Sequence, residues 1–254
     1  MPRIVSVLTV PEVLTTAFAV DEMYFHAACG ALQKAVVEQR RIDRAQKRIA
    51  RLKEREEIAL ERHEGDVFKA YDELEPVYIQ MESADYELGA AYAPFLESLA
   101  LVHILAAASL EAHINAHAAS LDGMLFRSFE RWSLESKWLI FPRLTEPARP
   151  GFDPGAQPFQ GFHRLVGFRN SLVHYQSRVE DWQAPGVPSF LGKLGLTIGE
   201  AEGSLNAVRG MVAELAKQFS LEEPFWLRRP YEPSGTSYFQ VIVKTGQNRP
   251  DSQP

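Results

Sequence analysis

The distribution of proline constrains the fold of this 254-residue chain most strongly. Proline is absent from residues 12–75, 95–141, 159–184 and 189–223. Because a proline inside a helix costs about 3 kcal/mol, these windows can hold long helices. They are also rich in Ala, Leu, Glu, Arg and Lys, which favour helices. Five of the 16 prolines fall between 142 and 158, which predicts a loop there. The proline-free windows on both sides of it predict an all-α fold.

The first proline-free window predicts a long helix from about 21 to 63. Its apolar residues follow the spacing of a heptad seam, with one polar interruption at Glu56. They are Ile42, Ala45, Ile49, Leu52 and Ala59. Gly65 and Asp66 predict a turn into a second helix that continues through about 82. We therefore expect a helical hairpin, or coiled-coil arm, as an N-terminal domain over 1–94.

The middle of the chain predicts an antiparallel helical bundle as a second domain over 95–222. Residues 95–110 are apolar on every side, as expected of a central core helix. Further helices are expected over 130–140, 159–177 and 198–219.

The two ends of the chain predict minor β structure. Residues 3–10 and 237–245 are rich in β-branched residues, and the two strands they predict could pair with each other. The C-terminal tail over 223–254 is expected to hold one strand, and its last nine residues are polar, which predicts disorder.

The net charge of −6 hides a strong local asymmetry. Residues 40–55 carry eight Lys or Arg and two acids, so that the rest of the chain has a net charge of −12. The cations recur at steps of three and four, which places them along one side of a helix. We expect them to contact RNA phosphates; a solvated coiled-coil face, or a contact for the acidic remainder of the protein, is the alternative. They are Arg40, Arg44, Lys47, Arg48, Arg51 and Arg55.

Cysteine, histidine and hydropathy patterns exclude several classes of protein. The one Cys excludes a disulfide framework and a Cys-rich zinc site, and it fits a reducing cytoplasm. The apolar stretch 99–110 is too short to cross a bilayer, so we expect no membrane contact. His113 and His117 have a metal-ligand spacing, but no third ligand lies at a helical offset from them. We expect core or interface histidines there, with no metal and no cofactor.

The most informative segment is GFRNSLVHYQ, residues 167–176. Asn170 and His174 are one helical turn apart and share a face, while Arg169 must extend around the edge of that helix to reach them. An Arg, an amide and an imidazole together can bind a phosphate and transfer a proton. The alternative is a histidine that ends a core helix beside a solvated arginine.

This segment resembles the signature of the HEPN family of all-helical domains, in which Arg and a polar residue precede three residues and a His. Arg169, Asn170 and His174 match it. The segments 108–118, 133–144 and 205–215 resemble the other core helices of the family, in the family's order, so that the resemblance covers about 95–220.

The resemblance implies a metal-independent endoribonuclease that acts as a homodimer. His174 would be the acid and base for attack of the RNA 2′-hydroxyl on the adjacent phosphate, and Arg169 would stabilise the charge on the phosphoryl oxygens. Asn170 would position His174 or a phosphate oxygen, with Glu111 and Tyr175 in supporting roles. DNA lacks the 2′-hydroxyl and is not expected as a substrate.

Toxins and antiphage effectors occur among such proteins, so an antitoxin or regulatory partner is expected. In one subgroup the antitoxin modifies a Tyr two residues after the His, whereas here Tyr175 follows His174 directly. A catalytically silent HEPN protein that binds RNA, nucleotide or protein is the second hypothesis. A coiled-coil adaptor whose helical domain only dimerises is the third.

Overall fold

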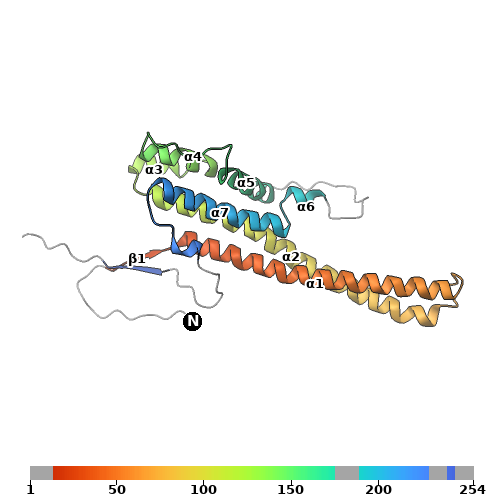
Figure 1. Ribbon diagram of the computed structural model, residues 1–254. Helices are drawn as coiled ribbons and strands as arrows, with labels where there is room; N and C mark the ends of the chain where they lie inside the picture. The colour runs from red at the N-terminus through yellow and green to blue at the C-terminus, as the bar shows by residue number, and fades with distance from the viewer. Residues whose placement is uncertain (1–13, 175–188, 229–238, 244–254) are drawn as a thin grey trace, which may run out of the picture.

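The computed structural model describes residues 14–174, 189–228 and 239–243 of the chain (Figure 1). In this part of the chain the protein is all-α, as predicted, apart from one two-stranded sheet. The helices are α1 (Val20–Arg62), α2 (Tyr71–Ala118), α3 (Gly123–Phe129), α4 (Leu134–Thr145), α5 (Phe159–Val173), α6 (Ser189–Lys193) and α7 (Ile198–Gln218), followed by the 3-10 turn η1 (Phe225–Leu227).

The helices α1 and α2 pack against each other and extend beyond the other helices as an arm (Figure 1). Small buried alanines along both helices let the two backbones approach closely. The buried residues of this seam include Ala45 and Leu52 on α1 and Leu74 and Ala84 on α2. The predicted hairpin is therefore confirmed.

The turn at the tip of the arm has a local explanation. Gly65 adopts a φ of +78°, a left-handed conformation that costs glycine little. The carboxylate of Asp66 then accepts hydrogen bonds from the backbone N–H groups of Phe68 and Lys69, which leads the chain into α2.

The second helix is much longer than predicted. We expected it to end near 82, but α2 continues through Pro76 and Pro94 to Ala118. Ala91, Phe95 and Leu99 are buried on both sides of Pro94, so tertiary packing outweighs the cost of one missing backbone hydrogen bond. The helix also crosses the domain boundary expected at 94–95 without a break.

The helices α4, α5 and α7 pack around the C-terminal half of α2 and form the body of the protein. Trp138 of α4 lies at its centre, with rings of Phe152 and Phe162 at 5.5 and 6.0 Å. The N-terminal half of α1 joins the same core through Phe25, Ala28 and Ala35.

The three later helices predicted in the body are present, but the ends of two of them differ from the prediction. The helices expected over 159–177 and 198–219 are α5 and α7, although α5 ends at Val173. The helix expected over 130–140 is α4, which starts later because Ser133 caps it and continues through Pro142 into the expected loop. The short helix α3 was not predicted; Asp122 accepts a hydrogen bond from the N–H of Met124 at its start.

The two strands are β1 (Leu14–Phe18) and β2 (Phe239–Val243), which pair antiparallel with Leu14 opposite Val243. The C-terminal strand was predicted within 237–245. It pairs with β1, the segment that directly precedes α1, while the strand expected over 3–10 lies outside the described residues.

One helix of the described part, α2, is long and apolar enough to cross a membrane by length and composition. Half of its most apolar 18-residue window is buried inside the protein, as expected of a core helix. This burial is consistent with a soluble protein.

The close seam of the arm predicts a penalty for larger side chains. Replacing Ala84, which is fully buried, by Leu should destabilise the protein by about 1–3 kcal/mol, because the extra methyl groups force the helices apart. The matched control Ala90→Leu, on the exposed side of α2, should change stability by less than about 0.5 kcal/mol. Urea unfolding followed by circular dichroism measures both, and equal effects would contradict the packing described for the seam.

Candidate functional site

The Arg–Asn–His motif, defined as Arg169, Asn170 and His174, lies at the C-terminal end of α5 on the surface. The helix ends at Val173, and His174 is its C-cap residue. The backbone N–H of His174 donates to the carbonyl oxygen of Asn170 at 2.9 Å, so the last helical turn places these two residues one above the other. Both side chains are exposed and Arg169 is half-buried.

The side chain of Arg169 is held by its neighbour in the motif. Its Nη1 donates to Oδ1 of Asn170 at 2.9 Å. In the part of the chain that the structure describes, Arg169 forms no ion pair and the imidazole of His174 has no hydrogen-bond partner. Among the described residues, no carboxylate therefore competes with an anion for this guanidinium, and the amide nitrogen of Asn170 donates to no protein acceptor.

A buried histidine lies directly beneath this end of α5. His103 of α2 is fully buried, and its Nε2 and Nδ1 lie 2.8 Å from the carbonyl oxygen of Gly195 and from Oγ of Ser204. Since a carbonyl only accepts, Nε2 carries the proton, and in the neutral ring the Ser204 hydroxyl donates to Nδ1. Burial lowers the pKa of His103, which favours this neutral form.

The same network fixes the residue that precedes the motif. The ring of Phe168 lies 5.0 Å from the ring of His103. Gly195 has a φ of +70°, and a Cβ built on it would lie 2.7 Å from the Phe168 ring, so glycine is required for this contact. The contacts of Phe168 with His103 and Gly195 fix the backbone next to Arg169, and the Arg169 side chain extends from there toward the surface.

Of the two expected supporting residues, the structure describes only Glu111, and it pairs Glu111 with a residue outside the motif. Glu111 accepts a hydrogen bond from Nζ of the buried Lys137 on α4 at 2.6 Å, and this pair links α2 to α4. Tyr175 lies outside the described residues. Glu111 therefore acts in the observed structure as the partner of a buried lysine, whose charge would otherwise be unpaired.

All six cations expected to contact RNA lie on α1, in the arm, and one of them pairs with an acid of α2. Arg48 donates to Glu87 of α2 at 3.1 Å and so links the two helices of the hairpin. The other five form an exposed line on α1, which we name the α1 cation stripe. Its members are Arg40, Arg44, Lys47, Arg51 and Arg55.

Of the two histidines with metal-ligand spacing, His113 belongs to the core and His117 is partly exposed. His113 is buried, and its Nδ1 lies 2.8 Å from a carboxylate oxygen of Asp21, which joins the start of α1 to the end of α2. Burial alone would raise the pKa of Asp21, but the hydrogen bond and charge of His113 lower it. Among the described residues, no three His, Cys, Asp or Glu side chains form a group that could hold a metal ion.

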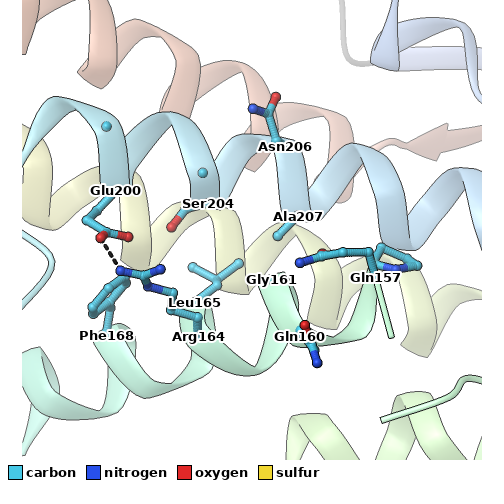
Figure 2. A pocket seen from close by; sticks show the side chains of 13 residues that line it. Gln157, Gln160, Gly161, Arg164, Leu165, Phe168, Glu200, Ser204, Asn206 and Ala207 are labelled. Carbon is cyan, nitrogen blue, oxygen red and sulfur yellow. Dashed lines mark hydrogen bonds and ion pairs between the residues drawn. The ribbon is translucent and has the colours of Figure 1, made fainter. Parts of the chain in front are cut away.

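A groove of about 580 Å³ lies between α5 and α7 (Figure 2). Gly161, Leu165 and Ala207 form its floor, and the ion pair between Arg164 and Glu200 spans one end. Asn170 and His174 do not line it. The groove thus lies along a different part of α5 from the motif.

Sequence patterns did not indicate the His103 network, the Glu111–Lys137 pair or the groove. Each joins residues from separate helices, such as His103 and Ser204, whose distance along the chain carries no local signal. The glycine-rich stretch 192–199 is only a weak signal for the positive φ of Gly195.

Comparisons with protein-family models, with curated protein sequences and with solved structures find no match to this chain. The function is therefore argued from the motif and its geometry.

The buried His103 predicts a loss of stability in acid. Because its pKa is lowered in the folded protein, the unfolded chain takes up a proton first as the pH falls through about 6.5, and stability decreases from there. Burial and the nearby His113 also lower the pKa of His117, which adds a loss of the same sign. The free energy of urea unfolding should decrease between pH 7.5 and 5.5, with a smaller decrease in His103→Gln. An unchanged pH dependence in that variant would contradict the neutral, buried imidazole.

Proposed function

We propose that this protein is a metal-independent endoribonuclease of the HEPN type, with the Arg–Asn–His motif as its active site. One observation carries the proposal: among the described residues, the half-buried guanidinium of Arg169 has no ion pair and the exposed imidazole of His174 has no hydrogen-bond partner, and both lie at the same end of α5. Arg169 bonds only to Asn170 of the same motif in this part of the chain, so no described carboxylate competes with a phosphate for its guanidinium.

The chemistry of these groups matches cleavage of a phosphodiester by the RNA itself. The imidazole of His174 accepts the proton of a 2′-hydroxyl while its oxygen attacks the adjacent phosphorus. The bond to the 5′-oxygen breaks, and that oxygen takes a proton from an imidazolium. Arg169 stabilises the negative charge on the phosphoryl oxygens, and the amide nitrogen of Asn170 donates to one of them. The products are a 2′,3′-cyclic phosphate and a 5′-hydroxyl.

A single imidazole cannot act as base and acid in the same step. We therefore propose a homodimer, in which the His174 side chains of the two copies act as base and acid. We propose that the second copy packs on the exposed side of α5 at Gly167. Gly167 lies one turn before Asn170 and Ser171, and a Cβ built on Gly167 meets no atom within 4 Å. Small residues at this position allow a close approach of two α5 helices, which would bring both His174 side chains to one cleft.

A toxin or antiphage effector in the cytoplasm, controlled by an antitoxin or another regulatory protein, is the setting we propose for such an activity. A catalytically silent protein that binds RNA or nucleotide through the same motif is the second candidate. Arg169, half-buried and without an ion pair among the described residues, favours both candidates over an adaptor that only dimerises.

Cleavage of RNA without metal is the direct prediction. The purified protein should cut single-stranded RNA in EDTA, and Arg169→Ala or His174→Ala should reduce the rate at least about 100-fold, since each removes a group that acts on the reacting phosphate. Electrophoresis of a labelled RNA measures the rate.

The matched control is His163→Gln, which changes an exposed histidine elsewhere on α5 that pairs with Glu135. It should cut at close to the wild-type rate. Cleavage that persists in both motif variants would contradict the assignment of the active site. RNA binding without cleavage by the wild type would favour the silent candidate.

The proposed contact between two α5 helices gives a separate prediction. Gly167→Gln places a bulky side chain in the open space and should produce a monomer with at least about tenfold slower cleavage, while the helix itself gains about 0.5–1 kcal/mol of propensity. Gly89→Gln on α2, another exposed helical glycine with open space around it, should remain a dimer. Sedimentation measures both, and a dimeric, active Gly167→Gln would contradict this interface.

A further inference from the structure

The cations of the α1 cation stripe have no acidic partners among the described residues. Arg40, Lys47, Arg51 and Arg55 form no ion pair with any residue in the described part of the chain, and Arg44 only donates from Nε to the carbonyl oxygen of Arg40. Residues at steps of four, three, four and four share one face of a helix. The stripe is about 22 Å long at 1.5 Å per residue.

The neighbouring helix of the hairpin is acidic and does not neutralise the stripe. Over its 48 residues α2 contains eight Asp or Glu and no Lys or Arg. Two of these acids, Glu73 and Glu87, pair with Arg62 and Arg48 of α1. Others along the arm are exposed and form no ion pair with described residues: Asp72, Glu75, Glu82, Asp85 and Glu97. The arm therefore attracts a polyanion along α1 and repels it along α2.

The end of α5 that carries the motif points toward the arm. Trp138 lies between His113 of α2 and Phe162 of α5, with ring centroids at 6.3 and 6.0 Å, and Phe168 lies against His103. A later residue of α5 thus contacts an earlier residue of α2, so the two helices are antiparallel. Figure 1 shows the same direction, with the arm extending past this end of α5.

Measured along the axis of α2, Arg40, the first residue of the stripe, lies at about the same level as the motif. Gln46 of α1 bonds Tyr92, which is about 16 Å along α2 from His103. Arg40 lies about 9 Å nearer the body than Gln46, and His174 lies about 9 Å nearer the arm than Phe168. Both therefore stand at nearly the same level. Since α1 and α5 both pack on α2, their axes are separated by at most about 20 Å.

We propose that the α1 cation stripe is a binding track for the backbone of single-stranded RNA that leads to the motif, which makes long single strands the preferred substrate. The inference rests on the proposed function for its cleavage step. Phosphates bind along the stripe without base recognition, because no aromatic side chain interrupts it. A strand that fills both the track and the cleft is held by additional ion pairs, which a short strand cannot form.

Binding to the track is measured separately from cleavage, in a His174→Ala background that leaves the RNA intact. The test variant carries Arg40→Gln, Lys47→Gln, Arg51→Gln and Arg55→Gln. Its affinity for a single strand of about 30 nucleotides should fall at least tenfold in 0.1 M salt, and the slope of log K against log salt should flatten by about 3, at about 0.7 per contact. Fluorescence anisotropy gives both values.

The matched control removes the same amount of charge from exposed lysines outside the stripe: Lys34→Gln, Lys53→Gln, Lys69→Gln and Lys217→Gln. Its affinity should change by less than about threefold, because phosphate contacts, rather than net charge, dominate the binding. Equal losses in the two variants would overturn the track and leave only a general effect of charge.

Cleavage then tests the preference for length, in the otherwise wild-type protein. The wild type should cut a strand of about 30 nucleotides at least tenfold faster than one of about six, at equal low concentration, and the stripe variant should cut both at similar rates. A protein that binds through the stripe but cuts neither strand would refute the ribonuclease and not the track. A stripe variant with unchanged RNA affinity that loses only association of the protein with itself would overturn the track, because a second copy would then be the partner of the stripe.

Discussion

The packing of α2 against four other helices is the constraint on which the rest of this structure depends. Its N-terminal half forms the seam with α1, and its C-terminal half is the central helix around which α4, α5 and α7 pack. A continuous helix of 48 residues spans both, and Pro94 does not interrupt it. The arm and the body are therefore fixed to one common axis, and the position of the arm relative to the end of α5 follows from it.

The polar groups buried along α2 determine where the exposed groups of the motif lie. His103 binds the connector before α7 through Gly195 and α7 itself through Ser204, and the Phe168 ring rests on both His103 and Gly195. These bonds hold the last turn of α5 in place. Arg169 then extends to the surface without an ion pair to any described residue. The proposed phosphate site would therefore rest on rigid support, which a site needs in order to hold its groups in position.

Local signals predicted much of this fold. The absence of proline and the heptad spacing of Ile42 and Leu52 predicted the long α1, and α5 and α7 had clear proline-free limits. Local signals failed where tertiary packing decides the outcome. Pro94 would end an isolated helix, but Phe95 and Leu99 are buried against other helices and keep α2 continuous. The motif residues were found from their spacing, and the helical turn from Asn170 to His174 is confirmed. The role expected for Glu111 depended on a resemblance that could not show the position of Lys137, 26 residues later.

Tertiary packing also decides which charged residues of the arm form ion pairs. The net charge of −6 argues only against a protein that coats RNA along its whole surface, since the cations of α1 and the acids of α2 lie on separate helices of one arm. Which cations pair across the hairpin depends on their direction around α1. Arg48 faces Glu87, whereas Arg51 and Arg55 face solvent, and a sequence alone places all of them in one basic segment.

We propose that the RNA's own 2′-hydroxyl attacks the phosphate at the Arg–Asn–His motif. The decisive measurement is cleavage of an RNA with a single 2′-deoxy substitution at a mapped cleavage position, otherwise unchanged and with EDTA present. Cleavage at this bond should stop while other bonds are still cut, and products from the unmodified RNA should end in 2′,3′-cyclic phosphate. Cleavage at the deoxy-substituted bond, or products ending in a 3′-hydroxyl, would contradict it.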